Sequence, residues 1–131
     1  MNAPGSVLVD TNVVVAYFRG DQALHSRFVG ASPLHLPWVV LGELHYGAQR
    51  AQRRQEQLAF IHDLLTYAVV LFPDHDTTAI YGELKAELAQ LGKPIPDNDL
   101  WIAATARQHD VPLATRDAHF AQVPRLKTLC W

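Results

Sequence analysis

Four acidic residues occupy positions that a purely structural role does not readily explain: Asp10, Glu43, Asp99 and Asp117. Asp10 and Asp117 follow short apolar runs that are typical of buried β-strands, and Glu43 lies within an apolar helical pattern. If the carboxylates meet at the carboxyl edge of a parallel sheet, they repel one another unless a divalent cation neutralises them. The set therefore favours a metal site, and two cations about 3.5–4 Å apart would suit in-line hydrolysis of a phosphodiester.

Each acid also has a local alternative, which the sequence leaves open. Asp10 and Asp117 are placed to cap the backbone N–H groups of the segments that follow them. Asp97, after a proline and before a helix, suits an N-cap position, and Asp99 in the first turn suits the helix dipole. Glu43 is harder to explain, because its helical neighbours are apolar or small and a buried, unpaired glutamate is costly. Its alternative is a side chain that extends out to water.

Short apolar runs alternate with helical patterns along the chain, which indicates βαβ units and an α/β fold with a parallel sheet covered on both faces. The expected strands cover residues 6–10, 33–36, 68–72, 111–115 and 126–130. The expected helices cover 12–18, 21–29, 37–50 and 97–109, and apolar stripes at 58/61/65 and 80/84/88/91 predict two more with core-facing sides. Pro37 suits the first position of its helix. Such sheets bind ligands beyond the carboxyl ends of their strands, where Asp10 and Asp117 fall.

Composition predicts one globular domain over residues 1–131, since 49% of the residues are hydrophobic and 18% are charged. No run approaches the roughly 18–20 apolar residues that cross a bilayer, and the opening residues 1–5 lack a signal-peptide pattern, so we expect a cytoplasmic protein without a membrane partner.

The lone Cys130 cannot form an intrachain disulfide. A net charge of −2 excludes a chain that coats nucleic acid by overall charge. The cluster Arg50, Arg53 and Arg54 is either a solvated helix face or a phosphate contact.

Several other kinds of site lack support in the sequence. The seven histidines form no His-Glu-x-x-His pair and have no cysteine partners, which argues against zinc, and no glycine-rich phosphate loop or Gly-x-Ser-x-Gly turn occurs. Two alternatives stay open. One is another metal-dependent nuclease or phosphatase, and the other is a receiver-like magnesium-binding module, for which Asp74 and Lys127 loosely occupy the acceptor and lysine places.

Four motifs, in order and spacing, resemble those of PIN-domain ribonucleases, specifically the VapC-type toxins of type II toxin–antitoxin systems. They are Val7-Leu8-Val9-Asp10-Thr11-Asn12-Val13, Gly42-Glu43-Leu44-His45-Tyr46-Gly47-Ala48, Ile95-Pro96-Asp97-Asn98-Asp99-Leu100-Trp101-Ile102-Ala103-Ala104 and Leu113-Ala114-Thr115-Arg116-Asp117. The resemblance covers nearly the whole chain. One departure is Val39-Val40, where many relatives carry a small hydroxyl residue that would support the glutamate.

The resemblance implies a three-layer fold with a five-stranded parallel sheet flanked by helices. It implies a Mg²⁺- or Mn²⁺-dependent endoribonuclease that hydrolyses RNA to 5′-phosphate and 3′-hydroxyl ends. The metal ligands it implies are Asp10, Glu43, Asp99 and Asp117, with Asp97 as a further acid. The residues it implies as supports of the acids or substrate contacts are Thr11, Asn12, Thr115 and Arg116, and either Arg116 or Lys93 would steady the phosphate.

The same resemblance implies two protein partners. One is a second copy of the chain in a homodimer, and the other is a cognate antitoxin whose C-terminal segment lies in a groove of the toxin. We expect that groove to involve the helices over residues 38–46 and 58–65, because Phe60 and Leu64 fall outside the apolar stripe of the second helix.

Overall fold

The computed structural model describes residues 5–131, and these form a parallel five-stranded sheet in the order β3-β2-β1-β4-β5. The strands are β1 (Val7–Val9), β2 (Leu34–Pro37), β3 (Ala68–Leu71), β4 (Leu113–Ala114) and β5 (Thr128–Leu129). The helices are α1 (Thr11–Phe18), α2 (Ala23–Gly30), α3 (Trp38–Arg50), α4 (Arg54–Leu64), α5 (His75–Gln90) and α6 (Asp97–His109), followed by a 3₁₀ segment, η1 (Ala118–Gln122). The predicted α/β class and all five predicted strands are confirmed. Residues 1–4, which belong to the segment considered for a signal peptide, lie outside the described residues.

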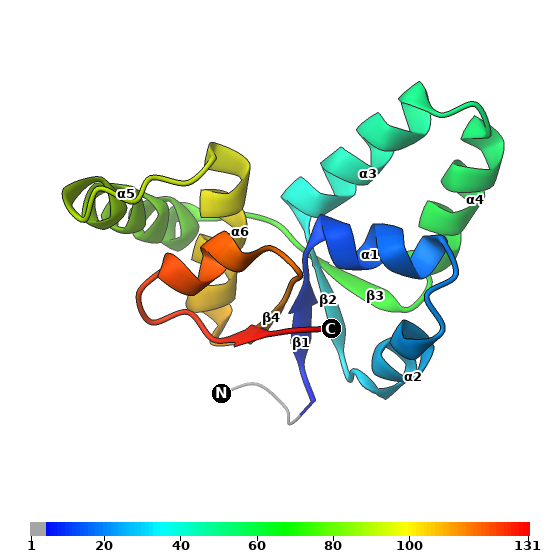
Figure 1. Cartoon of the computed structure of the whole chain (residues 1–131), viewed down its shortest axis with the longest axis horizontal. Coiled ribbons are helices and arrows are strands. Elements are labelled where there is room, and N and C mark those ends of the chain that lie inside the picture. The colour runs from blue at the N-terminus through cyan, green and yellow to red at the C-terminus, as the bar shows by residue number, and fades with distance from the viewer. Residues whose placement is uncertain (1–4) are drawn as a thin grey trace.

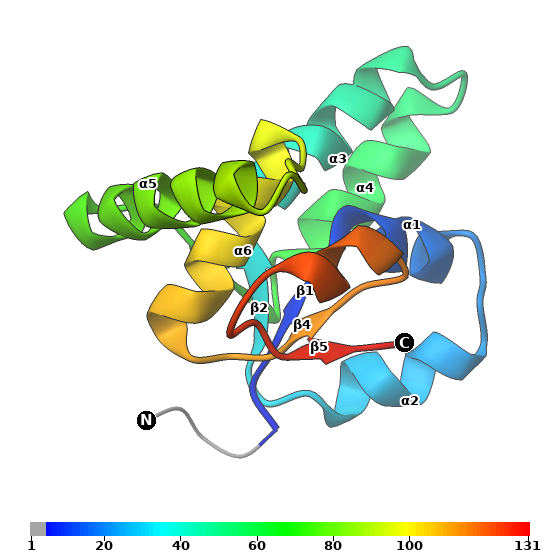
Figure 2. The same ribbon diagram turned by 60° about the vertical axis from the view of Figure 1, so that its left-hand side comes forward.

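The helices cover both faces of the sheet in two groups. The chain builds outward from β1 through β2 to β3, then returns to the other side of β1 for β4 and β5. Right-handed crossovers therefore place α1 to α4 on one face and α5 and α6 on the other, an arrangement visible in Figure 1. Figure 2 shows β4 and β5 beside α6 and the segment that follows β4. The reversal of direction between β1 and β4 creates the switch point at which such sheets hold ligands.

The centre of the sheet is buried from both sides, as expected of a parallel sheet between helices. Leu8 and Val9 of β1 and Leu113 of β4 have no exposed surface. The turn between α5 and α6 depends on Gly92, which adopts a φ of 70° that suits glycine. None of the described helices is long and apolar enough to span a membrane.

The structure corrects two predicted helix starts. Pro37 ends β2 and precedes α3, so it occupies the N-cap position rather than the first helical position. Asp97 is the first residue of α6 and makes no capping hydrogen bond, because Pro96 holds the N-cap position. In contrast, Asp10 and Asp117 both accept hydrogen bonds from the backbone of the segments they precede. Capping and site chemistry are therefore compatible for these two acids.

The predicted core stripes are only partly right. On α4, Ile61 and Leu64 are buried, whereas Leu65 lies just beyond the helix end with 38% of its surface exposed. On α5, Leu84 and Leu88 are buried, but Leu91 lies past the last turn and is 55% exposed. In both cases the helix ends one residue earlier than the stripe requires, so the final apolar residue leaves the core-facing side.

Candidate metal centre

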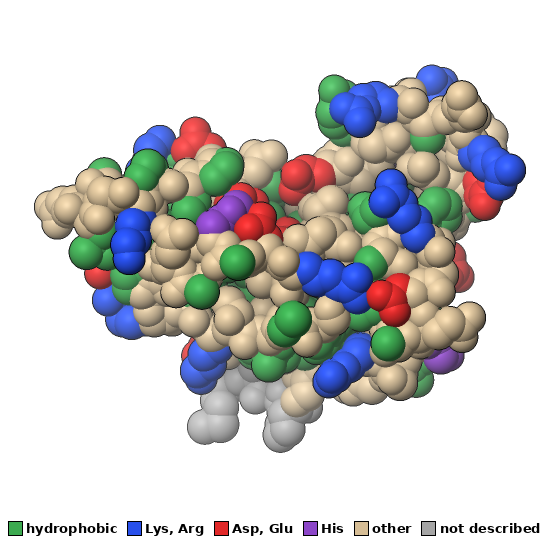
Figure 3. Space-filling view, in the orientation of Figure 1, with side chains coloured by type: hydrophobic (Ala, Val, Ile, Leu, Met, Phe, Trp, Pro, Cys, Tyr) green, Lys and Arg blue, Asp and Glu red, His purple; other side chains and the backbone are tan. Residues whose placement is uncertain are grey.

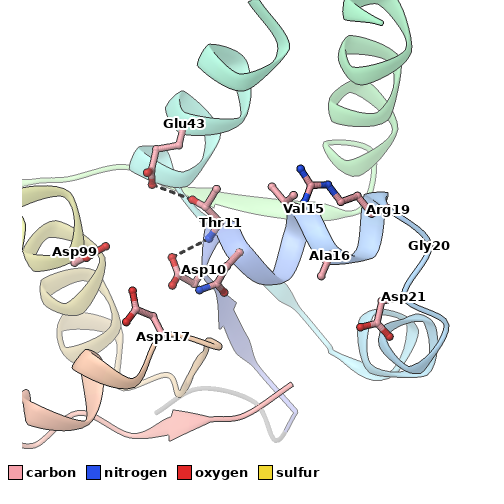
Figure 4. A pocket seen from close by; sticks show the side chains of 11 residues that line it. Asp10, Thr11, Val15, Ala16, Arg19, Gly20, Asp21, Glu43, Asp99 and Asp117 are labelled. Carbon is pink, nitrogen blue, oxygen red and sulfur yellow. Dashed lines mark hydrogen bonds between the residues drawn. The ribbon is translucent and has the colours of Figure 1, made fainter. Parts of the chain in front are cut away.

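The four acids meet around one solvent-open pocket, although four different elements carry them. Asp10 follows β1, Glu43 lies on α3, Asp99 lies on α6, and Asp117 follows β4. Figure 4 shows these side chains directed into a common space, which has a volume of about 880 Å³. In the space-filling view, acidic and histidine side chains occupy a hollow between the α5–α6 side and the α3–α4 side (Figure 3). The sheet edge expected to hold the site is therefore where the carboxylates gather.

The register of β1 against β4 brings the first acid into place. Val9 pairs with Ala114, so the next residues along the two strands, Asp10 and Thr115, lie side by side. The Thr115 hydroxyl donates to Asp10 Oδ2 at 2.7 Å, and the Thr11 backbone N–H donates to Oδ1 at 2.8 Å. Asp10 is only 5% exposed. Burial raises its pKa, and repulsion from Asp99 and Asp117 adds to that rise, while the two hydrogen bonds oppose it.

The Glu43 carboxylate also accepts a hydrogen bond from a hydroxyl group, and the donor lies on another helix. The Thr11 side chain donates to Glu43 Oε1 at 2.9 Å across 32 positions of sequence. This contact supplies the support that Val39 and Val40 cannot give, and it holds the carboxylate toward Asp10. Burial is the main cause of a raised Glu43 pKa, which the Thr11 bond lowers and the charges of Asp10 and Asp99 raise again.

A residue that the sequence patterns did not single out contacts two of the acids, Asp99 and Asp117. His119 Nε2 lies 2.7 Å from Asp99 Oδ2, and His119 Nδ1 lies 2.9 Å from Asp117 Oδ1. Burial raises the Asp99 pKa, the His119 contact lowers it, and repulsion from Asp117 raises it. The available sequence signal was the position of His119 two residues after a candidate ligand. That spacing differs from the helical pairs typical of zinc sites, so the pattern did not reveal it.

Three of the smaller polar residues serve as supports of the acids. Thr11 bonds to Asp10 through its backbone and to Glu43 through its hydroxyl. Thr115 Oγ1 accepts the Asp117 backbone N–H at 3.0 Å while its hydroxyl donates to Asp10, so one side chain connects two of the acids. Asn12 Oδ1 accepts the Arg116 backbone N–H at 3.2 Å and fixes the start of the loop that carries Asp117.

Three other candidates are not brought to the acids. The Asp97 side chain is 63% exposed and contacts Lys85 Nζ and the Tyr81 hydroxyl, each at 3.1 Å. The Arg116 guanidinium donates to Asp21 at 2.7 Å and to the Trp131 carbonyl at 2.6 Å. Neither Arg116 nor Lys93 lines the pocket. Among its described lining residues, Arg19 carries a positive charge instead.

Replacement of Thr115 by valine should weaken both the fold and the metal centre. Valine keeps the shape but leaves the Asp10 carboxylate and the Asp117 N–H without their partner, which should cost about 1–3 kcal/mol of unfolding free energy. Urea denaturation with chelator, together with a Mn²⁺ titration, measures the two effects. Thr105→Val is the matched control, because the Thr105 hydroxyl is buried but bonds only the Trp101 carbonyl of its own helix. Unchanged Mn²⁺ affinity in Thr115→Val would contradict a supporting role for Thr115.

Comparison with known proteins accords with this geometry. Residues 7–126 match the PIN domain. Ribonuclease VapC2 of Haemophilus influenzae is 32% identical over 127 residues, which cover 95% of this chain and 96% of that protein. The chain belongs to the PIN-domain family. A second relative of this PIN domain, the tRNA(fMet)-specific endonuclease VapC of Shigella flexneri, is 30% identical over 95% of this chain and 96% of its own.

A solved structure supports the same assignment for the PIN domain. A member of the VapBC family of toxin–antitoxin systems from Mycobacterium tuberculosis, VapBC-5, superposes with a TM-score of 0.79 at 28% identity. The match covers 98% of this chain and all of the other. The resemblance carried by the four motifs therefore extends to the full sheet and both helical layers.

Proposed function

We propose that this protein is a divalent-metal-dependent endoribonuclease and the toxin of a toxin–antitoxin pair. The observation that carries the proposal is the convergence of four carboxylates, from four elements distant in sequence, on one open pocket. Three of them, Asp10, Glu43 and Asp99, have raised pKa values because they are buried among like charges. Perturbed acids collected in a cleft mark a functional site. The relatives named as ribonucleases supply the substrate class.

The residues present fit a divalent cation. Carboxylate oxygens are the donors that Mg²⁺ and Mn²⁺ prefer, and the Asp99 and Asp117 oxygens lie within 4.8 Å of each other and of a His119 nitrogen. The ligands would be Asp10, Glu43, Asp99 and Asp117. A bound cation would supply Lewis acidity toward the phosphoryl group and the attacking water.

The side chains of the pocket would orient the reactants around that centre. Water would attack phosphorus and release one proton to solvent, while the bond from phosphorus to the 3′ oxygen breaks. The leaving oxygen would take up a proton from solvent, which yields 5′-phosphate and 3′-hydroxyl ends. Arg19 lines the pocket and is placed to contact a phosphate oxygen. Thr11 and Thr115 keep their acceptor carboxylates in fixed rotamers, so the negative charge stays directed at the pocket.

Alternative functions make different demands on the structure. A receiver-like module would use Asp74 and Lys127, but Asp74 forms a capping box at α5 and Lys127 lies 3.7 Å from Asp110. Neither residue lines the acidic pocket. A DNA nuclease or a phosphatase could use the same acids. Incubation of the purified protein with structured RNA, single-stranded DNA, flap DNA and a small phosphoester, with Mn²⁺ or with chelator, separates these activities. Preferred cleavage of DNA or of the small ester would refute the proposal.

The antitoxin would bind a second hollow on the α3–α4 side. This cavity of about 270 Å³ is lined by apolar side chains of α1, α3 and α4 and by the polar side chains of Arg19, Arg50 and Gln57. Phe60 lines this hollow and packs against Phe18 with ring centroids 4.8 Å apart. Leu64, the other residue expected to be exposed, is fully buried and takes no part. Arg19 lines both hollows, so a segment bound in this one would reach the acids.

A side chain added at Gly47 should block antitoxin binding without loss of any contact. Gly47 lines the hollow, and no atom of a packed neighbour lies within 4 Å of the point that a Cβ would occupy, so Gly47→Gln adds a side chain to the hollow without a clash at Cβ. We expect affinity for the product of the neighbouring gene to fall at least about tenfold. Calorimetric titration measures this change.

Gly42→Gln is the control for the Gly47 variant, because Gly42 lies on the same helix outside the hollow and a Cβ there would be equally unobstructed. Both variants should gain roughly 0.5–1 kcal/mol of stability from helix propensity. Equal affinities for the two would place the antitoxin elsewhere.

A further inference from the structure

His119 lies between two of the proposed ligands rather than beside one. Its two ring nitrogens contact different carboxylates, Asp99 at 2.7 Å and Asp117 at 2.9 Å. The two acids come from separate elements, α6 and the loop after β4, so the imidazole connects these two elements beside the pocket. The donor atoms of the three residues lie within 4.8 Å of one another. Two ligand atoms of one cation lie at most about 4.2 Å apart when both bonds are 2.0–2.1 Å long. The donor atoms of these three residues therefore need to approach one another only slightly to bind a common cation.

The backbone holds the imidazole at this place. The His119 N–H donates to Asp117 Oδ1 at 3.2 Å, which fixes the start of η1. The next residue, Phe120, is fully buried, and its ring centroid lies 5.1 Å from that of His119. Because Phe120 anchors the turn in the core, the backbone of His119 is held beside the acids. Its position is therefore a property of the fold.

We infer that His119 supplies a nitrogen ligand to the cation that Asp99 and Asp117 bind, an inference that rests on the proposed metal-dependent function. An all-oxygen set of carboxylates and water suits Mg²⁺, whereas an imidazole nitrogen favours transition ions. The centre should therefore bind Mn²⁺ more tightly than Mg²⁺. The Mn²⁺ preference should depend on His119 and not on the other histidines of the chain.

Pulsed electron paramagnetic resonance of Mn²⁺ bound to the stripped full-length protein tests the ligand directly. Wild type should show a ¹⁴N coupling from a coordinated imidazole. The His119→Asn variant should lose it, and its ratio of Mn²⁺ to Mg²⁺ affinity should fall at least about tenfold, the lower range for loss of even a supporting residue. His45→Asn is the control, since His45 is exposed on α3 two positions from Glu43 and should keep the coupling.

The possible results distinguish failure of the His119 ligand role from failure of the metal-dependent function. Mn²⁺ that binds without nitrogen coupling, or coupling that survives in His119→Asn, overturns the ligand role while the metal-dependent function stands. Absence of Mn²⁺ binding in wild type overturns both. If His119→Asn does not fold, wild type labelled with ¹⁵N-histidine tests for a histidine ligand without a substitution, and His119 is the histidine that lies with Asp99 and Asp117 among the described residues. The ¹⁴N coupling should be replaced by a ¹⁵N coupling, and an unchanged spectrum refutes the inference.

Discussion

The Asp99→Asn variant should cleave RNA more than about a hundredfold more slowly than wild type, because loss of a residue that merely supports a ligand already costs metal sites 10–100-fold. Asparagine preserves the shape of the side chain but removes the charge that would hold the cation. It also weakens the contact with His119, which connects Asp99 to Asp117. Single-turnover cleavage of a structured RNA, measured across a range of Mn²⁺ concentrations, gives both the rate and the metal dependence.

Asp97→Asn is the matched control for this prediction, and its rate should stay within a few-fold of wild type. Both residues lie in the first turn of α6, so both substitutions lose the same favourable interaction with the helix dipole. They differ in surroundings, since Asp97 is largely exposed and contacts Lys85 and Tyr81 rather than the pocket. Equal losses in the two variants would show that helix charge, and not metal ligation, governs activity. A large loss in Asp97→Asn alone would assign the ligand role to that residue.

The metal-free protein should gain stability from Asp10→Asn at neutral pH, and the cation should then stabilise the variant far less than wild type. Asp10 is buried among like charges, and asparagine removes the repulsion. The amide can still accept from Thr11 and can donate to Thr115 Oγ1. A hundredfold excess of cation over its dissociation constant should stabilise wild type by about 2.7 kcal/mol, or roughly 10 °C in melting temperature.

The pH dependence follows from the direction of the pKa shifts. Asp10, Glu43 and Asp99 have folded-state pKa values above their ordinary values. Between the two values the folded state binds more protons than the unfolded state, so the unfolding free energy falls as pH rises. In chelator, these three acids should therefore lower the stability of wild type progressively as pH climbs from about 4 through their raised pKa values. Asp10→Asn should show a shallower decline.

Asp21→Asn should change the stability of the metal-free protein in the opposite direction, although Asp21 lines the same pocket. Asp21 lines the pocket, but its hydrogen bond to Arg116 lowers its pKa, so its charge is favourable in the fold. That variant should be less stable than wild type in chelator and should keep the full metal-induced shift. Melting curves at several pH values, with chelator and with millimolar Mn²⁺, compare the three proteins. A metal-induced shift in Asp10→Asn as large as in wild type would exclude Asp10 from the site.

Local sequence patterns predicted the architecture, because the spacing of apolar residues reflects the secondary structure of each short segment. Apolar runs such as Val7-Leu8-Val9 are typical of buried strands, and their alternation with helical stripes indicated a parallel sheet. Ligands of parallel sheets bind beyond the carboxyl ends of the strands, and this rule predicted that Asp10 and Asp117 lie at the same edge. Errors arose at element ends. Leu65 and Leu91 followed the correct period past the last helical turn, where a residue no longer faces the core.

What the sequence determined by itself was the fold class, the sheet edge and the identity of the acids that gather there. Only the tertiary structure decided which neighbours those acids have. Thr115 reaches Asp10 across 105 positions, and His119 bridges Asp99 and Asp117, because strand register and helix packing set distances that no local period encodes. The same packing separated two aspartates in one helical turn: Asp99 faces the pocket, and Asp97, two residues earlier, faces Lys85 on α5. A helix rotates about 200° over two residues, so the docking of α6 against α5 chooses which acid can serve the site.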